Sequence, residues 1–502
     1  MTEKEQLSEE VVRKTINSYV AKNLPSSQYI KIRDKKVIHD SVHGTGIFYP
    51  HEIAFLDLPI IQRLRRISQT DVASLVFPAG NHNRFEHTVG VTIVAGKMVE
   101  SLFIKNCISS EEREYILFNC RIAAILHDCG HGPFSHLTEQ IYASELEKLR
   151  SENKILKGAS AHEMLSYFIA TSEPLKKFNE QTIKGVYNIE IDLDFVGNMI
   201  VGYIDREDET SKKFGFVVEL INGAFDADKL DYILRDAHST GIHMALDLPR
   251  LFYTLDVIDD EEGVKRLALN ISGVTTLEEI IFNKMILIST IYHHQKVRAA
   301  GCMLRSIIEA SGIFKNALDY LEYTDDMIYC LNSDNEYIKE QLVNMKNRIL
   351  PKRALCFSSH TIENTAVLKD IISFLEDKDT RQNIILNIVK YVKDVFKHEV
   401  KENEIFIDVP KPPTFKEATQ CLIKSEGSKN NYILLQTVFP TDAWVRSFSE
   451  NKWRGFVYAM PEKCKYVTKA SKHVFEEVFK VKFNKFAEEL CKLDEEIEST
   501  TL

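Results

Sequence analysis

The apolar residues of this chain recur mostly three and four positions apart, which is the spacing of helices that bury one face. We predict helices starting at His162 and over residues 1–28, 60–70, 88–102, 111–127, 146–156, 225–236 and 280–308. The helix over 111–127 should end there, because Gly130, Gly132 and Pro133 follow it closely. The chain is therefore predicted to be mainly α.

Strand-like patterns are confined to short segments. Residues 255–269 predict a small β-hairpin with an acidic turn at 259–263. Further on, β-rich runs at 432–439 and 455–459 precede a predicted helix at 469–490. We expect four regions: an N-terminal helix or arm at 1–29, a helical core with the small hairpin at 30–314, a helical extension at 315–402 and an α+β C-terminal lobe at 403–502.

The composition narrows the class of protein. With 502 residues, 44% hydrophobic and 27% charged, the chain is typical of a soluble, folded protein. Its formal net charge of −10 argues against nucleic acid as a partner. No uninterrupted apolar run is long enough to span a bilayer and the N-terminus lacks an apolar signal core, so we expect no membrane partner. Nine cysteines without a CxxC pair indicate reduced thiols and a cytoplasmic protein.

A candidate metal site comes from four ionisable residues. His127 and Asp128 end a predicted buried helix, where such side chains need partners or a ligand. His87 and Asp228 lie at two other predicted helices, and together the four offer two imidazoles and two carboxylates. That donor set suits Mn, Fe, Mg or Zn and leaves positions open for water and phosphate. A lone His-Asp pair is common in proteins, and His87 alone could be a hydrogen-bonded core residue.

The stretches around these residues resemble a known family. They read VIHDSVHG, PIIQRLRRISQ, VFPAGNHNRFEHTVGV, AAILHDCGHGPFSH and DADKLDYILRDAHSTGI, and they span residues 30–296. In this order they resemble the HD-domain deoxynucleoside triphosphate triphosphohydrolases, both the vertebrate enzymes that join a SAM domain to an HD domain and their bacterial homologues. The resemblance implies an all-helical HD-domain core that converts a dNTP and water into a 2′-deoxynucleoside and inorganic triphosphate. The C-terminal third matches weakly.

The resemblance also implies roles around the metal. His87, His127, Asp128 and Asp228 would hold one divalent ion, and additional Mg could accompany the nucleotide phosphates. The leaving 5′-oxygen needs a proton, and a histidine can supply one near neutral pH. The candidate catalytic residues are His131, His136, His162 and Glu139, together with Arg84. Glu139 stands where the family usually has Asp, in the position that pairs with His162.

Five residues are candidates for binding substrate. Arg84 suits phosphate oxygens and a transition state that gains negative charge, and Lys229 could neutralise outer phosphates. By resemblance, Tyr232 packs near the sugar and excludes a 2′-hydroxyl, while Asp236 and Gln69 bind the 3′-hydroxyl. Steric exclusion and buried polar pairing are a physical basis for preferring deoxyribose. Core packing of Tyr232 and a solvated Lys229 are the structural alternatives.

A regulatory site is a further possibility that the resemblance raises. Lys36, Val37, Asp57, Gln62 and Arg65 match positions that bind an activating guanine nucleotide at a subunit interface. This implies GTP or a dNTP as activator and a homo-oligomer, either dimer or tetramer. The alternative is a short helix over 62–66 with a solvated basic face.

Two other functions remain open. A metal and water do not specify which phosphate bond breaks, so the same site could serve a nucleotide phosphomonoesterase or phosphodiesterase. A nucleotide sensor with little turnover is the alternative from another class.

Overall fold

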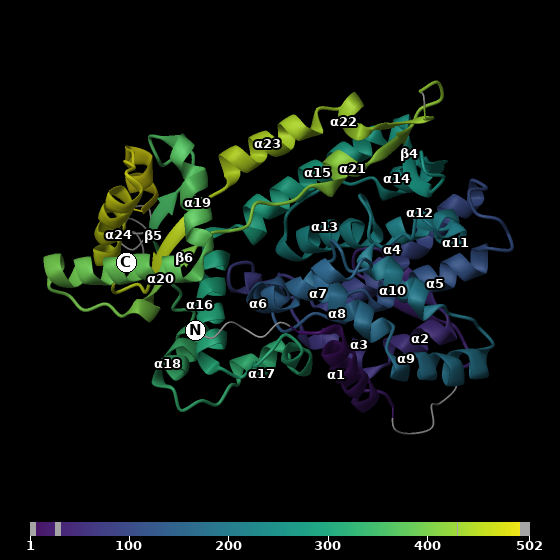
Figure 1. Cartoon of the computed structure of the whole chain (residues 1–502), viewed down its shortest axis with the longest axis horizontal. Coiled ribbons are helices and arrows are strands. Elements are labelled where there is room, and N and C mark those ends of the chain that lie inside the picture. The colour runs from purple at the N-terminus through teal and green to yellow at the C-terminus, as the bar shows by residue number, and fades with distance from the viewer. Residues whose placement is uncertain (1–6, 26–31, 429, 492–502) are drawn as a thin grey trace. The chain divides into compact units, whose positions relative to one another are not determined.

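The structure is a computed structural model that describes residues 7–25, 32–428 and 430–491 (Figure 1). The chain divides into two compact units. Unit 1 comprises residues 1–287, 314–331 and 415–442, and unit 2 comprises 288–313, 332–414 and 443–502. Each unit therefore combines stretches that are distant in sequence. The four-region division remains a prediction.

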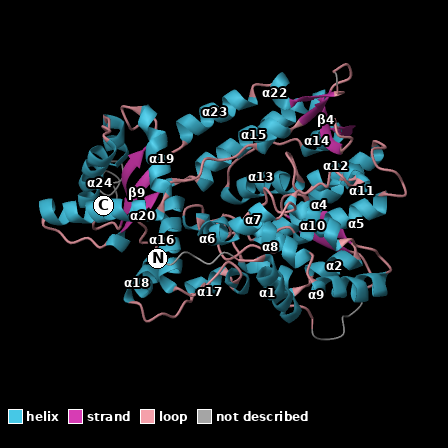
Figure 2. Ribbon diagram, viewed as in Figure 1, coloured by secondary structure: helices cyan, strands magenta, loops and turns pink. Residues whose placement is uncertain are grey.

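Unit 1 is built mainly from helices, as Figure 2 shows. They are α1 (Glu9–Lys22), α2 (Pro50–Leu56), α3 (Pro59–Gln62), α4 (Arg84–Ile104), α5 (Arg113–Leu126), α6 (His136–Tyr142), α7 (Glu147–Glu152), α8 (Ala161–Ala170), α9 (Glu173–Phe178), α10 (Leu193–Val201), α11 (Glu209–Lys213), α12 (Gly215–Glu219), α13 (Ala227–Thr240), α14 (Leu248–Thr254), α15 (Val274–Leu287), α17 (Asp325–Tyr329), α21 (Lys416–Gln420) and α22 (Leu435–Val438). The mainly α class predicted from the sequence is confirmed.

Two small sheets complete unit 1. An antiparallel hairpin joins β1 (Lys36–Asp40) to β2 (Gly44–Phe48). The predicted hairpin is confirmed as β3 (Leu255–Asp259) and β4 (Lys265–Asn270), paired Leu255 to Leu269. The second sheet has the order β3-β4-β7-β8, because β7 (Leu422–Lys424) and β8 (Tyr432–Leu434) extend it.

Unit 2 places helices against a three-stranded sheet with the order β5-β9-β6. Helices α16, α20 and α24 pack on this sheet, and Phe357, Ile388, Val457 and Phe475 are among its buried core residues. The elements are α16 (Gln295–Ser311), α18 (Glu336–Lys346), β5 (Lys352–Phe357), α19 (Leu368–Glu376), α20 (Lys378–Tyr391), β6 (Ile405–Asp408), α23 (Thr441–Lys452, whose first two residues belong to unit 1), β9 (Gly455–Ala459) and α24 (Cys464–Phe479). The strand predicted at 455–459 is confirmed.

Helix α4 forms the centre of unit 1, where α5 and α13 pack against it. In the described chain it is the one helix long and apolar enough to cross a membrane by length and composition. Of the apolar stretch of this helix, 72% is buried within the protein, so α4 uses its apolar surface to form the core. The predicted helix over 88–102 is thus longer at both ends.

The long helix predicted over 280–308 is wrong. Helix α15 ends at Leu287, a π-helical segment covers Ile288–Tyr292, and α16 starts at Gln295 with His294 as its N-cap. His294 adopts an extended backbone and its side chain accepts a hydrogen bond from Lys296 N. The apolar spacing continues across the break, and periodicity alone does not report the change in backbone.

Several other predicted boundaries are wrong. The helix expected over 60–70 ends in a 3-10 turn at Arg63–Arg66, because Ile67 is extended. The run at 432–439 is a strand only to Leu434 and then becomes helical. Helix α24 ends at Phe479, before the predicted 490, because Lys480 takes a left-handed backbone. The helix predicted over 1–28 is α1 where it is described, and residues 1–6 and 26–31 lie outside the described chain.

Candidate active site

Three helix ends bring the predicted metal ligands together. His87 lies in the first turn of α4, whose N-cap Asn83 accepts a hydrogen bond from Glu86 N. His127 and Asp128 directly follow α5, and Asp228 lies in the first turn of α13. In the sequence His87 and Asp228 are 141 positions apart, and tertiary packing makes all four residues neighbours.

His87, His127 and Asp228 can each offer one ligand atom within 4.8 Å of the others, and Asp128 lies beside the two histidines. His87 Nε2 lies 3.0 Å from Asp228 Oδ1 and 3.6 Å from Asp128 Oδ2. His127 Nε2 lies 3.3 Å from His87 Nε2 and 3.4 Å from Asp128 Oδ1. The side chain of Asp228 is 36% exposed while the other three are at most 9% exposed, so the cluster opens to solvent on the Asp228 side.

Contacts at the Nδ1 atoms orient the imidazoles of His87 and His127. His87 Nδ1 is 2.7 Å from Asp231 Oδ2, and His127 Nδ1 is 2.7 Å from the carbonyl oxygen of Ala124. Such contacts hold Nδ1–H as donor and leave the Nε2 lone pair free for a cation. Burial alone lowers the pKa of His87, but the hydrogen bonds to Asp228 and Asp231 outweigh it and raise the pKa to about 10. The carboxylates thus favour positive charge here, and the donor set fits a divalent ion.

Asp231 is the most connected residue that sequence reasoning missed. It contacts His87 and also accepts hydrogen bonds from Arg235 Nε and Nη2 at 2.8 Å, and His43 Nε2 lies 2.7 Å from its Oδ1. Arg235 Nη2 also donates to Asp40 at 2.7 Å. Burial alone would raise the pKa of Asp231, yet Arg235, His43 and His87 outweigh it and hold the pKa well below its usual range. Its signal was its position three residues after Asp228 on one helical face.

A second cluster adjoins the first. His162 Nδ1 lies 3.0 Å from Glu139 Oε1, and His136 Nδ1 lies 2.9 Å from Glu139 Oε2. The His131 and His162 rings stack with centroids 3.8 Å apart, and His131 Nε2 is 3.4 Å from Asp128 Oδ1. The structure therefore brings all four predicted catalytic residues of this group together, beside the metal cluster.

The two stacked histidines, His131 and His162, differ in their state of protonation. Burial lowers the pKa of His162, but the Glu139 carboxylate outweighs burial and raises it to about 9. Burial and the charge of Arg84 hold the pKa of His131 well below its usual range. His131 is accordingly neutral at pH 7, while His162 carries a proton. The side chain of His136 is 57% exposed.

Arg84 is held in place by buried contacts. Its Nη1 donates to Asp128 Oδ2 at 2.5 Å and its Nε donates to Ser135 Oγ at 2.6 Å. Its Nη2 is buried and has no hydrogen-bond partner in the described chain, so one strong donor is available for a ligand. Ser135 and Phe134 both have positive φ, and the buried Asp325 carboxylate accepts a hydrogen bond from Phe134 N at 2.7 Å. Sequence analysis missed Ser135 and Asp325.

Two of the three predicted sugar-binding residues, Asp236 and Gln69, both contact His82. Asp236 Oδ1 lies 2.7 Å from Nε2 of the buried His82, and Gln69 N donates to the His82 carbonyl at 3.1 Å. The Gln69 side-chain oxygen is buried without a hydrogen-bond partner in the described residues. Tyr232 is half-buried on α13. Lys229 donates its amine to Asp226 at 2.6 Å, so its charge is already partly neutralised.

The predicted activator residues are spread over separate elements. Gln62 and Arg65 contact each other, with Arg65 Nε donating to Gln62 Oε1 at 2.8 Å. Asp57 is exposed at the end of α2. Lys36 and Val37 lie on β1, where Val37 is 68% exposed. Their assignment to an activator stays a prediction.

Comparison with known proteins agrees with this site. A model of the HD domain matches residues 84–192, and a model of the HD associated region matches 246–485. The matched HD domain includes His87, His127 and Asp128.

Individual proteins are also similar to this chain over part of their length. An uncharacterised protein of Methanocaldococcus jannaschii is 27% identical over 86% of this chain and 80% of its own. The deoxynucleoside triphosphate triphosphohydrolase SAMHD1 of Homo sapiens is 30% identical over 62% of this chain and 49% of its own. A SAMHD1 homolog of Dictyostelium discoideum is 26% identical over 65% and 61%. The chain thus spans about half to three-fifths of the length of the two named triphosphohydrolases.

The chain is therefore similar to HD-domain proteins over residues 84–192, the segment that carries three of the four candidate metal ligands. More particularly, it resembles the HD-domain deoxynucleoside triphosphate triphosphohydrolases, as its motifs predicted. These findings support an HD-superfamily hydrolase with His and Asp groups able to hold a metal ion.

Proposed function

We propose that this protein is a metal-dependent dNTP triphosphohydrolase that converts a dNTP and water into a 2′-deoxynucleoside and inorganic triphosphate. The observation that carries the proposal is the adjacency of the two clusters: His131 lies 3.4 Å from the candidate metal ligand Asp128 and stacks on His162. A candidate cation site and a protonated histidine are thus close neighbours.

His87, His127, Asp128 and Asp228 would hold the ion. A divalent ion there would supply Lewis acidity toward a phosphoryl oxygen and toward water. Arg84 adds its unpaired Nη2, a donor that suits negative charge gained at phosphate in the transition state.

His162 is the best-placed general acid. It is protonated at neutral pH because of Glu139, and so has a proton to give to the leaving 5′-oxygen. His131 and His162 lie in nearly parallel ring planes, so their nitrogens cannot both point at one ion. That geometry favours handling of protons over a second metal in this cluster. Glu139 then stabilises the charged form of His162, and its extra methylene relative to Asp does not prevent the pairing.

The proposed sugar preference rests on two residues of α13, Tyr232 and Asp236, and on Gln69. Asp236, already paired with His82, and the unpaired oxygen of Gln69 offer acceptors for a hydroxyl group. Tyr232, four residues after Asp228, lies on the same face of the helix. We propose that these residues bind the 3′-hydroxyl and exclude a 2′-hydroxyl. Activation by GTP or a dNTP in a homo-oligomer is part of the same proposal.

Product analysis tests the reaction. The protein is loaded with Mn²⁺ or Mg²⁺ and incubated with the four dNTPs, singly and mixed, with and without GTP. Chromatography and phosphorus NMR then identify the products, with His127→Ala as the matched inactive control. Deoxynucleoside plus intact triphosphate supports the proposal. Orthophosphate would favour a phosphomonoesterase, and nucleotide binding without turnover by metal-loaded protein would favour a sensor.

A further inference from the structure

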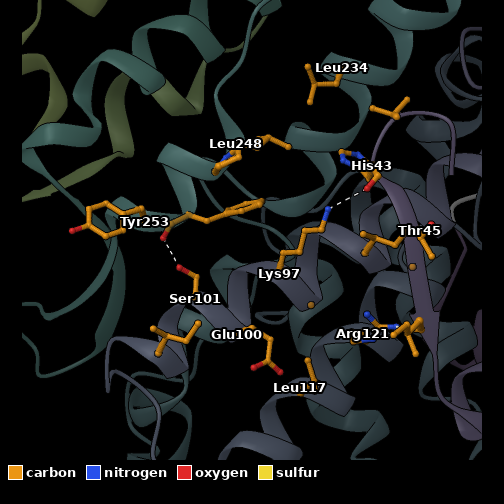
Figure 3. Close-up of a pocket in the computed structure, with 18 of the residues that line it drawn as sticks. His43, Thr45, Lys97, Glu100, Ser101, Leu117, Arg121, Leu234, Leu248 and Tyr253 are labelled. Atoms are coloured by element: carbon orange, nitrogen blue, oxygen red, sulfur yellow. Dashed lines mark hydrogen bonds between the residues drawn. The ribbon is translucent and has the colours of Figure 1, made fainter. Parts of the chain in front are cut away.

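In the part of the chain that the structure describes, unit 1 contains a cavity whose lining includes none of the candidate metal ligands. We call it the hairpin pocket, and it has a volume of about 1010 Å³. Strand β2 and the turn before it, the second half of α4 and helix α14 contribute to its walls; its lining includes His43, Thr45, Lys97, Ser101, Leu248 and Tyr253 (Figure 3). A volume of this size accommodates a drug-sized or nucleotide-sized molecule. In the described chain, none of the five predicted activator residues lines it.

The hairpin pocket has an apolar surface that is open to solvent. Ile104 and Tyr253 are each 76% exposed and Ile47 is 56% exposed, although all three are large apolar or aromatic side chains. Isolated exposed apolar residues are common on proteins, but here three line one cavity. A ligand with an aromatic or aliphatic body would cover them.

The hairpin pocket also carries positive charge that no acid neutralises. Lys35, Lys97 and Lys105 line it, and none of them makes an ion pair in the described residues. Lys97 donates to the His43 carbonyl at 3.2 Å, and Lys105 donates to the Leu255 carbonyl at 2.8 Å.

Glu100 and Arg121 also line the cavity, but each forms an ion pair with another residue of the protein. The carboxylate of Glu100 is paired with Arg113 at 2.6 Å. The guanidinium of Arg121 makes two hydrogen bonds to the buried Glu52. The three lysines therefore set the charge of the cavity, and an anionic group on the ligand is expected.

One lining residue contacts the support of the candidate metal centre. His43 Nε2 lies 2.7 Å from Asp231 Oδ1, and Asp231 Oδ2 lies 2.7 Å from His87 Nδ1. Figure 3 shows Lys97 extending from α4 toward His43. An anion that draws the Lys97 amine toward itself would remove the hydrogen bond that Lys97 gives to the His43 backbone. The position of His43, and with it the support of His87, would then depend on whether the cavity is filled.

We propose that the hairpin pocket binds an organic anion with an aromatic or aliphatic body, and that its occupancy changes the affinity of the candidate metal centre for its ion through His43 and Asp231. The proposal rests on the metal centre and not on which phosphate bond the protein cleaves. It predicts a ligand site on a different side of α4 from the substrate residues Arg84 and Gln69.

The first experiment measures binding of a probe of this chemical class. The fluorescent dye 1-anilinonaphthalene-8-sulfonate, an aromatic anion, is titrated into the full chain. We expect saturable one-to-one binding. The variant Lys97→Glu/Lys105→Glu should weaken binding at least about 10-fold, while the matched surface control Lys14→Glu/Lys148→Glu should not change it. Absence of saturable binding, or equal binding by both variants, overturns the proposal.

The second experiment measures coupling without using turnover. Isothermal titration gives the Mn²⁺ affinity with and without saturating dye, and the dye affinity with and without Mn²⁺. We expect about a 5-fold or larger change, equal in both directions because linkage is reciprocal. The variant His43→Phe should still bind the dye, but the dye should no longer change its affinity for Mn²⁺. The reciprocal test in the unaltered protein stands even if that variant does not fold. Dye binding with no change in Mn²⁺ affinity overturns the proposal, whatever the protein hydrolyses.

Discussion

Replacing Glu139 by Gln isolates the charge that keeps His162 protonated. The amide keeps nearly the same shape and can still accept the hydrogen bond that His162 N gives to Glu139 Oε1 at 3.1 Å. What it removes is the negative charge that outweighs burial and holds the pKa of His162 at about 9. In Glu139→Gln the burial remains, so the pKa should fall below the ordinary histidine value of about 6.5.

The expected loss of kcat follows from the pKa of His162 with and without the Glu139 charge. At pH 8 a histidine of pKa about 9 is roughly 90% protonated, and one of pKa about 6.5 is roughly 3% protonated. If His162 gives the proton to the leaving group, Glu139→Gln should lose about 30-fold in kcat at pH 8. The loss should shrink toward pH 6, because the protonated fraction of His162 in the variant rises as the pH falls. The shift of at least about 2.5 pH units corresponds to about 3 kcal/mol.

The assay is the pH profile of kcat with Mn²⁺ at saturating dNTP. Glu147→Gln, an exposed carboxylate on α7, serves as the control for loss of one charge and should keep the profile of the unaltered protein. An unchanged alkaline limb in Glu139→Gln would refute the reasoning. So would a uniform loss of kcat at every pH, because that would indicate misplacement rather than deprotonation of His162.

Stability gives a second measurement of the same pair. The pKa of His162 is raised on folding, so its contribution to the free energy of unfolding is complete below about pH 6.5 and is lost as pH rises through about 9. The difference in unfolding free energy between the unaltered protein and Glu139→Gln should therefore decrease between these values. A pH-independent difference would contradict the assigned charge state.

Three further predictions concern the metal centre and the second unit. Asp231→Asn should weaken Mn²⁺ binding about 10- to 100-fold, because His87 loses a charged partner; unchanged affinity by calorimetry would contradict this. His127→Ala should leave no bound Mn²⁺ by elemental analysis, and full occupancy would show that the ligand set is wrong. Arg298→Met should cost about 3–5 kcal/mol in unfolding free energy, because it leaves Asp408 buried without its two hydrogen bonds from Arg298. Adding Asp408→Leu should recover much of that loss in denaturant titrations.

The sequence by itself was enough for the class of fold and for the ligand candidates. Helical spacing and strand-and-turn patterns are both local, so the buried helix α4 and the hairpin at 255–269 could be predicted from neighbouring residues. His127 and Asp128 stood out because a buried apolar helix rarely ends in two ionisable groups without a reason. The ordered motifs then pointed to the HD-domain family.

Only the tertiary structure decided which side chains support those candidates. Asp231 looks like an ordinary helical acid in sequence, and its contacts with His87 and with His43, 188 positions away, depend on packing. The break between α15 and α16 is also a matter of backbone geometry that apolar spacing does not report. The charge states of His131 and His162 could not be read from residue type, because burial and neighbouring charges set a pKa and both depend on the folded chain.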